Sequence, residues 1–207
     1  YIDCDVIVRN DLVELYHSAE LGRNYLAAVF EAPLEFQMER FEAIGCDPME
    51  YINSGFLIMN LKLMRQDEMV DKFLKASKAD YLEFPEQDVL NQLCKGRITG
   101  LAPYHNSIRT FYLPQYKKSF LQKYTEEDWE EVQRHGTVHY TGAKPWNCFT
   151  VEFRLWWQYY DRLPEEIKKE WKINKKIYLL AKLNGIPCVY FVLNGLRILY
   201  RKLKYTL

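Results

Sequence analysis

Short apolar runs separated by polar stretches recur along the first part of the chain, and segments with helical spacing dominate the rest. The runs have the length of buried strands, and we predict strands at Tyr1–Val8, Tyr25–Phe30, Gly55–Leu61 and Thr137–Tyr140. Apolar positions three or four residues apart predict helices from Asn10 or Asp11 to Tyr16, Leu63 to Ser77, Asp88 to Lys95, and Thr125 to Gly136. Residues 31–50 show no period and predict a long loop.

From residue 150 onward the pattern is helical throughout. It predicts three helices, over 150–161, 164–183 and 187–204, and the last two have a proline near their start. Strands alternating with helices, followed by helices alone, indicate an α/β core over residues 1–149 and a helical C-terminal annex over 150–207.

Charge is distributed unevenly although the net charge is zero. Residues 151–207 hold 12 Lys or Arg against 5 Asp or Glu, and residues 1–150 carry the opposite imbalance. A basic annex suits an anionic partner such as a membrane surface, and it equally fits a solvated helix face or a helix packed on the core. We expect peripheral membrane contact through residues 187–207 as one of these alternatives, and no nucleic-acid partner.

The five cysteines favour a reducing compartment. Their number is odd and no two form a CxxC pair, which argues against a disulfide framework and against a zinc–thiolate site. No run of 18 apolar residues and no signal peptide is visible in the sequence. We therefore expect a cytoplasmic location, with attachment to the inner face of the membrane as a possible addition.

Asp3 and Asp5 interrupt an apolar run near the start of the sequence. Side chains two apart on a strand project from the same face, so we expect both carboxylates to point together. Two neighbouring charges need a cation or hydrogen bonds to compensate them. Because hard divalent ions prefer oxygen ligands, the pair is a candidate metal site, although many surface strands carry the same spacing.

His139 begins the segment His-Tyr-Thr-Gly-Ala-Lys-Pro-Trp, which has the composition of an anion-binding loop. Gly142 allows close backbone approach, and Lys144 brings a cation near that backbone. The imidazole could complete a metal shell with the two aspartates, or it could be a core or capping histidine. One imidazole with two carboxylates favours Mn²⁺, with Mg²⁺ as the alternative.

Two further polar clusters stand at the ends of predicted buried elements, where α/β sheets place ligands. Asn53-Ser54-Gly55 opens an apolar strand, and Glu86-Gln87-Asp88 opens a helix. Taken separately, the first fits a turn and the second fits a helix cap with a favourable dipole.

The order of these motifs resembles family 8 of the retaining glycosyltransferases, which includes bacterial lipopolysaccharide galactosyl- and glucosyltransferases and the glycogenins. The segments that carry the resemblance span residues 1–146 and are Tyr1–Asp5, Tyr51–Gly55 with Ile58–Leu61, Glu86–Asn91, and His139–Gly142 with Lys144–Trp146. The resemblance implies a GT-A fold, a Rossmann-like mixed sheet flanked by helices. It also implies nucleotide-binding strands before Tyr1, which this sequence does not contain.

The same resemblance implies the residue roles and the reaction. Asp3, Asp5 and His139 would bind Mn²⁺ at the UDP diphosphate, and Gly142 and Lys144 would contact the phosphates. The donor-sugar pocket would be lined by Asn53, Ser54, Gly55, Glu86 and Gln87. Gln87 and Asp88 are the candidate catalytic residues.

The predicted function is therefore transfer of a hexose from a UDP-sugar to a saccharide or glycolipid acceptor, with retained configuration and dependence on Mn²⁺. Two alternatives stay open. One is another metal-dependent nucleotide-processing transferase, and the other is a non-catalytic relic that binds sugar nucleotides.

Overall fold

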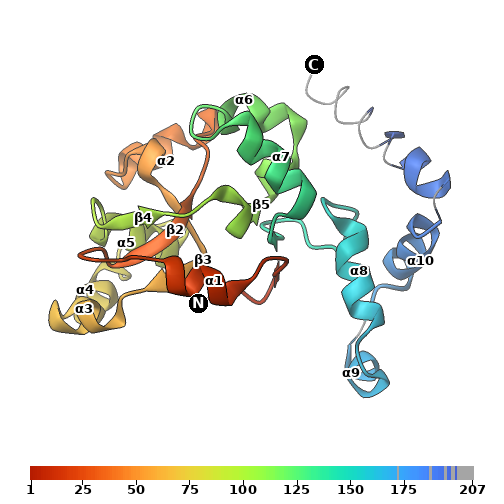
Figure 1. Cartoon of the computed structure of the whole chain (residues 1–207), viewed down its shortest axis with the longest axis horizontal. Coiled ribbons are helices and arrows are strands. Elements are labelled where there is room, and N and C mark those ends of the chain that lie inside the picture. The colour runs from red at the N-terminus through yellow and green to blue at the C-terminus, as the bar shows by residue number, and fades with distance from the viewer. Residues whose placement is uncertain (172, 187, 194, 197–198, 200–207) are drawn as a thin grey trace. The chain divides into compact units, whose positions relative to one another are not determined.

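A computed structural model describes residues 1–171, 173–186, 188–193, 195–196 and 199. The chain divides into two compact units, Tyr1–His139 and Tyr140–Leu207, which we call unit 1 and unit 2 and describe separately (Figure 1). The boundary predicted from the sequence at 149/150 stays a prediction about domain organisation.

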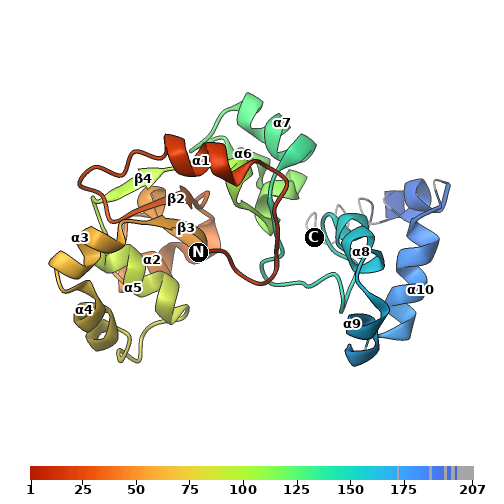
Figure 2. The ribbon, with the colours of Figure 1, turned by 60° about the horizontal axis from the view of Figure 1, so that its bottom comes forward.

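Unit 1 contains a three-stranded sheet built on β2 (Leu26–Phe30). β3 (Ile52–Met59) pairs with β2 antiparallel, with Ala27 opposite Ile58, and β4 (Ile98–Gly100) pairs parallel on the other side. The mixed pairing and the helices packed on the sheet confirm the predicted α/β class (Figure 2). The buried residues of this core are Tyr25, Leu26, Ala28, Ile52, Leu57, Met64, Met69 and Cys94.

A second small sheet has β6 (Val138–His139) at its centre. β1 (Val6–Ile7) pairs with it antiparallel and β5 (Ser107–Ile108) pairs with it parallel. The segment before β1 also contacts the first sheet, through a bridge between Ile2 and Phe56 and through the Asp3 N–H, which donates to the Gly55 carbonyl at 2.9 Å. The N-terminal segment therefore connects the two sheets, and it brings the Asp3 backbone to β3.

The prediction of one strand over Tyr1–Val8 is wrong. Cys4 and Asp5 form a turn, in which the Val6 N–H donates to the Asp3 carbonyl at 3.3 Å, and only Val6–Ile7 continue as strand. Backbone bonds on both sides of the turn hold Asp3 to β3 and Val6 to β6. The two carboxylates therefore approach one another across a turn instead of along one strand face.

The helix predicted after Asp11 is present as α1 (Leu12–Ser18), and the Asp11 carboxylate accepts from the Val13 and Glu14 N–H groups. The predicted loop over 31–50 is wrong. It contains three short helices, η1 (Glu35–Gln37), α2 (Met38–Ala43) and η2 (Pro48–Glu50). These helices are too short to show a period in the sequence, and buried Phe41, Ile44 and Tyr51 form their own small core.

The single helix predicted from Leu63 to Ser77 is two helices, α3 (Leu61–Gln66) and α4 (Met69–Ala76). Glu68 between them has φ of 53°, a left-handed conformation that ends one helix and sets the direction of the next. α5 (Pro85–Leu93) begins before the predicted Asp88, with Pro85 in its first turn.

Residues 101–124 form short turns of helix that the sequence did not reveal. They are η3 (Pro103–His105), η4 (Arg109–Tyr112), η5 (Pro114–Tyr116) and α6 (Lys117–Phe120). α7 (Glu126–His135) was predicted, and it begins with a capping box in which the side chains of Thr125 and Asp128 each accept from the other's backbone N–H.

Unit 2 begins with a loop over residues 140–152, which is followed by α8 (Phe153–Asp161), α9 (Glu165–Glu170) and α10 (Lys175–Asn184). The single helix predicted over 164–183 is therefore two helices, of which the first ends at Glu170 and the second begins at Lys175. The unit packs around Phe153, Trp157, Tyr160 and Ala181. Of the helix predicted over 187–204, residues 188–193 have helical backbone, and much of the remainder lies outside the described residues.

Candidate functional site: a carboxylate–imidazole cluster beside a buried amide network

Asp3, Asp5 and His139 come together in unit 1 although the sequence separates the aspartates from the histidine by almost the whole unit. One ligand atom from each lies within 4.8 Å of the others. His139 Nε2 is 3.5 Å from Asp3 Oδ2 and 3.4 Å from Asp5 Oδ1. His139 is brought there by β6, and the two aspartates are brought there by the turn that precedes β1, which is the neighbour of β6.

The donor set fits a divalent cation. Ligand atoms about 2.1 Å from an ion and adjacent in an octahedron lie roughly 3 Å apart, which is close to the two distances measured from His139 Nε2. The imidazole is buried, and the side chains of Asp3 and Asp5 keep 27% and 12% of their area exposed. Protein side chains would thus coordinate an ion from one side and leave its other side open to solvent. An open side is needed if the ion is to be shared with a substrate.

Gly55 makes the space that the imidazole occupies. A Cβ atom on this residue would lie 2.1 Å from His139 Cε1 and 3.0 Å from Asp3 Oδ2. Any side chain at position 55 would collide with the ring, so a residue predicted to contact the donor sugar also has a steric role in the cation site.

The phenol of Tyr1 supports Asp3. Its hydroxyl donates to Asp3 Oδ1 at 2.6 Å, which leaves Oδ2 directed toward His139. This hydrogen bond, with burial and the negative charges of Asp3 and Glu86 adding to it, raises the pKa of Tyr1 to about 12. The phenol therefore remains a hydrogen-bond donor at neutral pH. Glu86, whose side chain is predicted to contact the donor sugar, is exposed in the first turn of α5.

Gln87 on α5 lies at the centre of a buried network that includes three of the predicted donor-site residues. Its Oε1 accepts from the Ser54 N–H at 3.0 Å, from Asn53 Nδ2 at 3.1 Å and from the Ser54 hydroxyl at 3.3 Å. Its Nε2 donates to Glu31 Oε1 at 3.2 Å and to the Tyr51 hydroxyl at 3.1 Å. The side-chain amide is thus held in one orientation.

Asn53 and Asn106 extend this network to the cation site. Asn106 Nδ2 donates to Asn53 Oδ1 at 2.9 Å, and Asn106 Oδ1 lies 3.0 Å from His139 Nδ1. Asn53, Asn106 and His139 are all buried. A continuous series of hydrogen bonds therefore runs from Gln87 to the imidazole that faces Asp3 and Asp5.

Asp88, predicted as a candidate catalytic residue, has both carboxylate oxygens occupied. Oδ1 accepts from Tyr51 at 2.5 Å and from Arg40 at 2.7 Å, and Oδ2 accepts from the N–H groups of Glu83 and Phe84. Burial alone would raise the pKa of Asp88, but the hydrogen bonds from Tyr51, Arg40 and the Phe84 N–H outweigh it and hold the pKa below its ordinary value. The carboxylate is fully buried, and it anchors the start of α5.

Gly142 and Lys144, the predicted phosphate contacts, belong to unit 2. Gly142 has φ of 72°, which favours glycine. Lys144 Nζ donates to the Tyr140 carbonyl at 2.7 Å, and the indole of Trp157 donates to the Pro145 carbonyl at 3.2 Å. The segment after His139 is therefore a loop tied to unit 2 by its own hydrogen bonds.

The sequence did not identify Glu31, Arg40 or Asn106 as parts of this region, and it assigned no role to Tyr51, which opens one of the motifs. Glu31 follows directly after the predicted strand at Tyr25–Phe30, and this position at a strand end was the one available signal. Arg40 lies in the segment predicted as loop, and Asn106 lies among short elements without a pattern.

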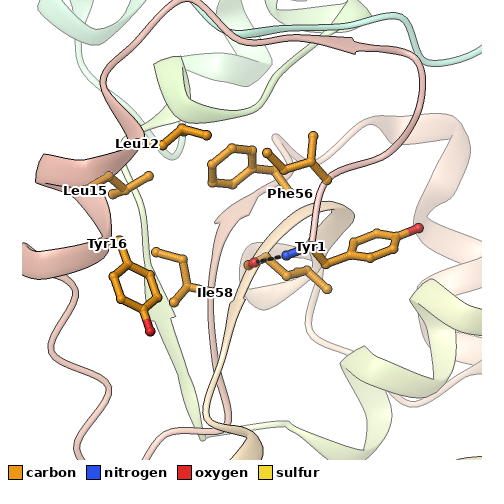
Figure 3. Close-up of a pocket in the computed structure, with 8 residues that line it drawn as sticks. Tyr1, Leu12, Leu15, Tyr16, Phe56 and Ile58 are labelled. Carbon is orange, nitrogen blue, oxygen red and sulfur yellow. Dashed lines mark hydrogen bonds between the residues drawn. The ribbon is translucent and has the colours of Figure 1, made fainter.

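An apolar cavity of about 130 Å³ lies on another side of β3 (Figure 3). Leu12, Leu15 and Tyr16 of α1 line it opposite Phe56 and Ile58 of β3, and the ring of Tyr1 points away from it. Gly55 and Phe56 are neighbours on β3, so successive residues of one strand serve the cation site and the apolar cavity.

Comparison with known proteins agrees with the fold and with the order of the motifs. The family described as "Glycosyl transferase family 8" matches residues 1–150. The lipopolysaccharide 1,2-glucosyltransferase of Escherichia coli K12 is 31% identical over 159 residues, covering 73% of this chain and 44% of that protein. The general stress protein A of Bacillus subtilis 168 is 28% identical over 156 residues, covering 72% of this chain and 53% of that protein.

Among solved structures, the galactosyltransferase LgtC in complex with donor and acceptor sugar analogues superposes with a TM-score of 0.61. It is 27% identical, and the match covers 83% of this chain and 64% of that one. An active-site mutant of LgtC superposes with a TM-score of 0.60 at 28% identity.

The fold is that of the GT-A type glycosyltransferases, as the sequence predicted. The chain belongs to glycosyl transferase family 8. Members of this family typically use a divalent metal. The chain spans about half the length of the curated relatives described above, or less.

Proposed function

We propose that this protein transfers a hexose from a UDP-sugar to a saccharide or lipid-linked acceptor, with retention of configuration. The observation that carries the proposal is the convergence of Asp3, Asp5 and His139 within 4.8 Å, beside a buried network that includes Asn53, Ser54 and Gln87. Relatives named as a glucosyltransferase and as a galactosyltransferase bound to donor and acceptor sugar analogues support a sugar donor and a sugar acceptor.

The cation site would hold Mn²⁺, because two carboxylates and one imidazole suit a borderline ion better than a strictly oxygen-preferring one. A divalent ion bound there supplies Lewis-acid stabilisation of the departing diphosphate. Tyr1 holds Asp3 with one oxygen directed toward His139, and Gly55 leaves the ring its position. Gly142 and Lys144 of the following loop are proposed to contact the diphosphate.

The donor sugar is proposed to lie against Asn53, Ser54, Gly55, Glu86 and Gln87. Gln87 is a neutral amide and a poor nucleophile, so we propose a displacement on one face of the sugar in which the leaving diphosphate helps to deprotonate the acceptor. Asp88, with both oxygens occupied, is proposed to act as a positioning residue. It acts through Tyr51, which donates to Asp88 and accepts from Gln87.

A donor screen tests the proposal. The protein is incubated with Mn²⁺ and a panel of UDP-sugars, and released UDP is measured, with an acceptor present and absent. Asp5→Ala is expected to lower the rate about 10²–10³-fold, the range for loss of one preorganised electrostatic contact. Release of pyrophosphate in place of UDP would favour a different nucleotide-processing transferase, and binding of UDP-sugar without turnover would favour a non-catalytic relic.

We also propose peripheral contact between the C-terminal part and an anionic membrane. Exposed apolar side chains, Leu179, Phe191 and Val192 among them, accompany the exposed lysines at 175 and 176. Residues 187–207, the segment expected from the sequence to dock, lie largely outside the described part of the chain. Co-sedimentation with phosphatidylglycerol vesicles but not phosphatidylcholine vesicles is expected, and retention of that binding after deletion of 187–207 would contradict this assignment.

Described helices include none that is long and apolar enough to cross a membrane.

A further inference from the structure

The buried amide network has a fixed direction because it begins at a backbone donor. The Gly55 N–H donates to Asn53 Oδ1 at 3.0 Å. A backbone N–H can only donate, so the oxygen of the Asn53 side chain must face Gly55. The Asn53 amide nitrogen then faces the other way, where Glu31 Oε1 and Gln87 Oε1 accept from it at 3.0 and 3.1 Å.

The orientation of Asn53 determines that of Asn106. Asn53 Oδ1 is an acceptor, so the group of Asn106 that lies 2.9 Å away must be its amide nitrogen. The oxygen of Asn106 is then the atom 3.0 Å from His139 Nδ1. Asn106 is fully buried, so water does not compete for either end of its amide.

The orientation of Asn106 in turn selects the tautomer of His139. An amide oxygen can only accept, so Nδ1 must carry a proton, and in the neutral ring Nε2 therefore presents its lone pair to Asp3 and Asp5. A lone pair directed at two carboxylate oxygens 3.4 and 3.5 Å away is the arrangement that a cation between them would stabilise.

We infer that Asn106 is a positioning residue that sets the Nδ1–H tautomer of His139, and that the Gly55 backbone N–H fixes its direction through Asn53. That this tautomer matters for cation binding rests on the function proposed above. The tautomer itself follows from the hydrogen bonds alone. A second backbone donor, the Ser54 N–H on Gln87 Oε1, fixes the neighbouring amide in the same sense. Exchanging the oxygen and nitrogen of any one of these amides would therefore bring two donors or two acceptors together at a buried position, which is costly.

The first test is the tautomer in the metal-free protein. Nitrogen-15 NMR of labelled histidine distinguishes a ring nitrogen that carries a proton from one that does not, at a pH where the ring is neutral. His139→Gln assigns the His139 signals among the four histidines of the chain. We expect a proton on Nδ1 and none on Nε2, and the reverse distribution would overturn the inference whatever the activity of the protein.

Two variants of Asn106 separate its roles. Asn106→Leu keeps much of the volume and removes the acceptor, so the His139 tautomer is expected to become mixed. Asn106→Asp keeps an acceptor toward Nδ1 and, when its other carboxyl oxygen is protonated, also a donor toward Asn53 Oδ1, so it is expected to preserve the tautomer. An unchanged tautomer in a folded Asn106→Leu variant would contradict the assignment.

Asn91→Leu is the matched control. Asn91 is also a buried asparagine, but it hydrogen-bonds the backbone of Ile52 and Gln87 and not His139. We expect it to lower stability as Asn106→Leu does and to leave the His139 tautomer unchanged. If both leucine variants changed the tautomer equally, a general loosening of unit 1 would replace the specific role of Asn106.

Titration with Mn²⁺, followed by the electron paramagnetic resonance signal of the free ion, extends the test to the cation. Asn106→Leu is expected to weaken Mn²⁺ binding about tenfold to a hundredfold, and Asn106→Asp to bind within a few-fold of the wild type. A wild-type protein that binds no Mn²⁺ would count against the proposed function, while the NMR result would still decide the tautomer. Equal Mn²⁺ affinity of wild type and folded Asn106→Leu would overturn the link to the cation.

Discussion

The interiors of the two units are held by different interactions. Unit 1 buries a series of amides, carboxylates and an imidazole, in which each hydrogen bond sets the orientation of the next group. Unit 2 contains a cluster of aromatic rings, of which Phe153, Trp157 and Tyr160 are buried. Trp156 stacks on Tyr160 and on Trp171 at interplanar angles of 13° and 14°, and Trp157 meets Tyr160 edge to face.

This difference separates two requirements of a folded protein. Aromatic packing contributes much apolar area, and the hydrophobic part of its energy does not depend on direction, so it tolerates small shifts. Buried hydrogen bonds contribute little net stability, but an unmade bond is costly, so they specify one arrangement of atoms. Unit 1 is thus suited to hold chemical groups at defined positions, and unit 2 is suited to remain folded.

The largest effect on stability is expected in the aromatic unit. Trp157 is 3% exposed and contacts the rings of Phe153, Trp156, Tyr160 and Tyr178. Trp157→Ala is expected to lower the free energy of unfolding of unit 2 by about 3–5 kcal/mol, measured by urea denaturation. Mn²⁺ affinity is expected to be unchanged, because Asp3, Asp5 and His139 all belong to unit 1, and a parallel loss of both would argue against the division made here.

A slightly smaller loss is expected when the ion pair at the start of α5 is broken. Asp88→Asn leaves the Arg40 guanidinium, whose side chain is 11% exposed, without its carboxylate. We expect a loss of about 3 kcal/mol in the free energy of unfolding of unit 1. The double variant Arg40→Met with Asp88→Asn is expected to recover part of this loss, because the uncompensated charge is then absent and the asparagine side chain keeps an oxygen acceptor.

The same pair predicts a pH dependence with a definite sign. The pKa of Asp88 is lowered in the folded state, so its contribution is complete above the ordinary value of 3.8 and is lost as the pH falls below it. The stability difference between wild type and Asp88→Asn should therefore decrease in acid below about pH 4. A difference that grew in acid would contradict the assigned ion pair.

Next in size is the effect of filling the space beside the imidazole. In Gly55→Ala the new methyl group cannot coexist with His139 in its present position. Mn²⁺ affinity is expected to fall about a hundredfold, equivalent to about 2.7 kcal/mol. Circular dichroism should show a retained fold, because β3 pairs with its neighbour through backbone hydrogen bonds. An unchanged affinity would show that the ring is not needed for the cation.

The smallest effect is expected for a hydrogen bond outside the buried network. Thr125→Ala removes half of the exposed capping box of α7 and should cost about 1 kcal/mol in the free energy of unfolding. Thr125→Ser keeps the hydroxyl and should recover most of this loss. If Thr125→Ala lowered the free energy of unfolding as much as Asp88→Asn, exposed polar contacts in unit 1 would matter as much as buried ones, contrary to expectation.

The sequence revealed those features of the fold that depend on local pattern. β2, α1 and α7 were predicted because apolar runs and capping residues specify them within a few positions of the chain. The turn at Cys4 and Asp5 was missed, because backbone bonds to β3 and β6, both distant in sequence, cause it. The left-handed Glu68 was missed because the apolar spacing continues through it.

The candidate site divides in the same way. Asp3, Asp5, His139 and Gln87 were predicted as site residues because they stand in motifs that resemble a known family. Asn106 and Arg40 lie in segments without such motifs, and only the folded chain brings them to His139 and Asp88. Asp88 was also predicted from a motif, and its four hydrogen-bond donors favour the positioning role proposed above.

The bare Cα of residue 55 gives a means of sorting related sequences by inspection. A homologue that carries any side chain at this position could keep strand pairing and overall architecture, yet it would have no room for the ring that completes the cation cluster. Such a sequence would be a candidate for a member that has lost catalysis while it retains the shape of one that has it.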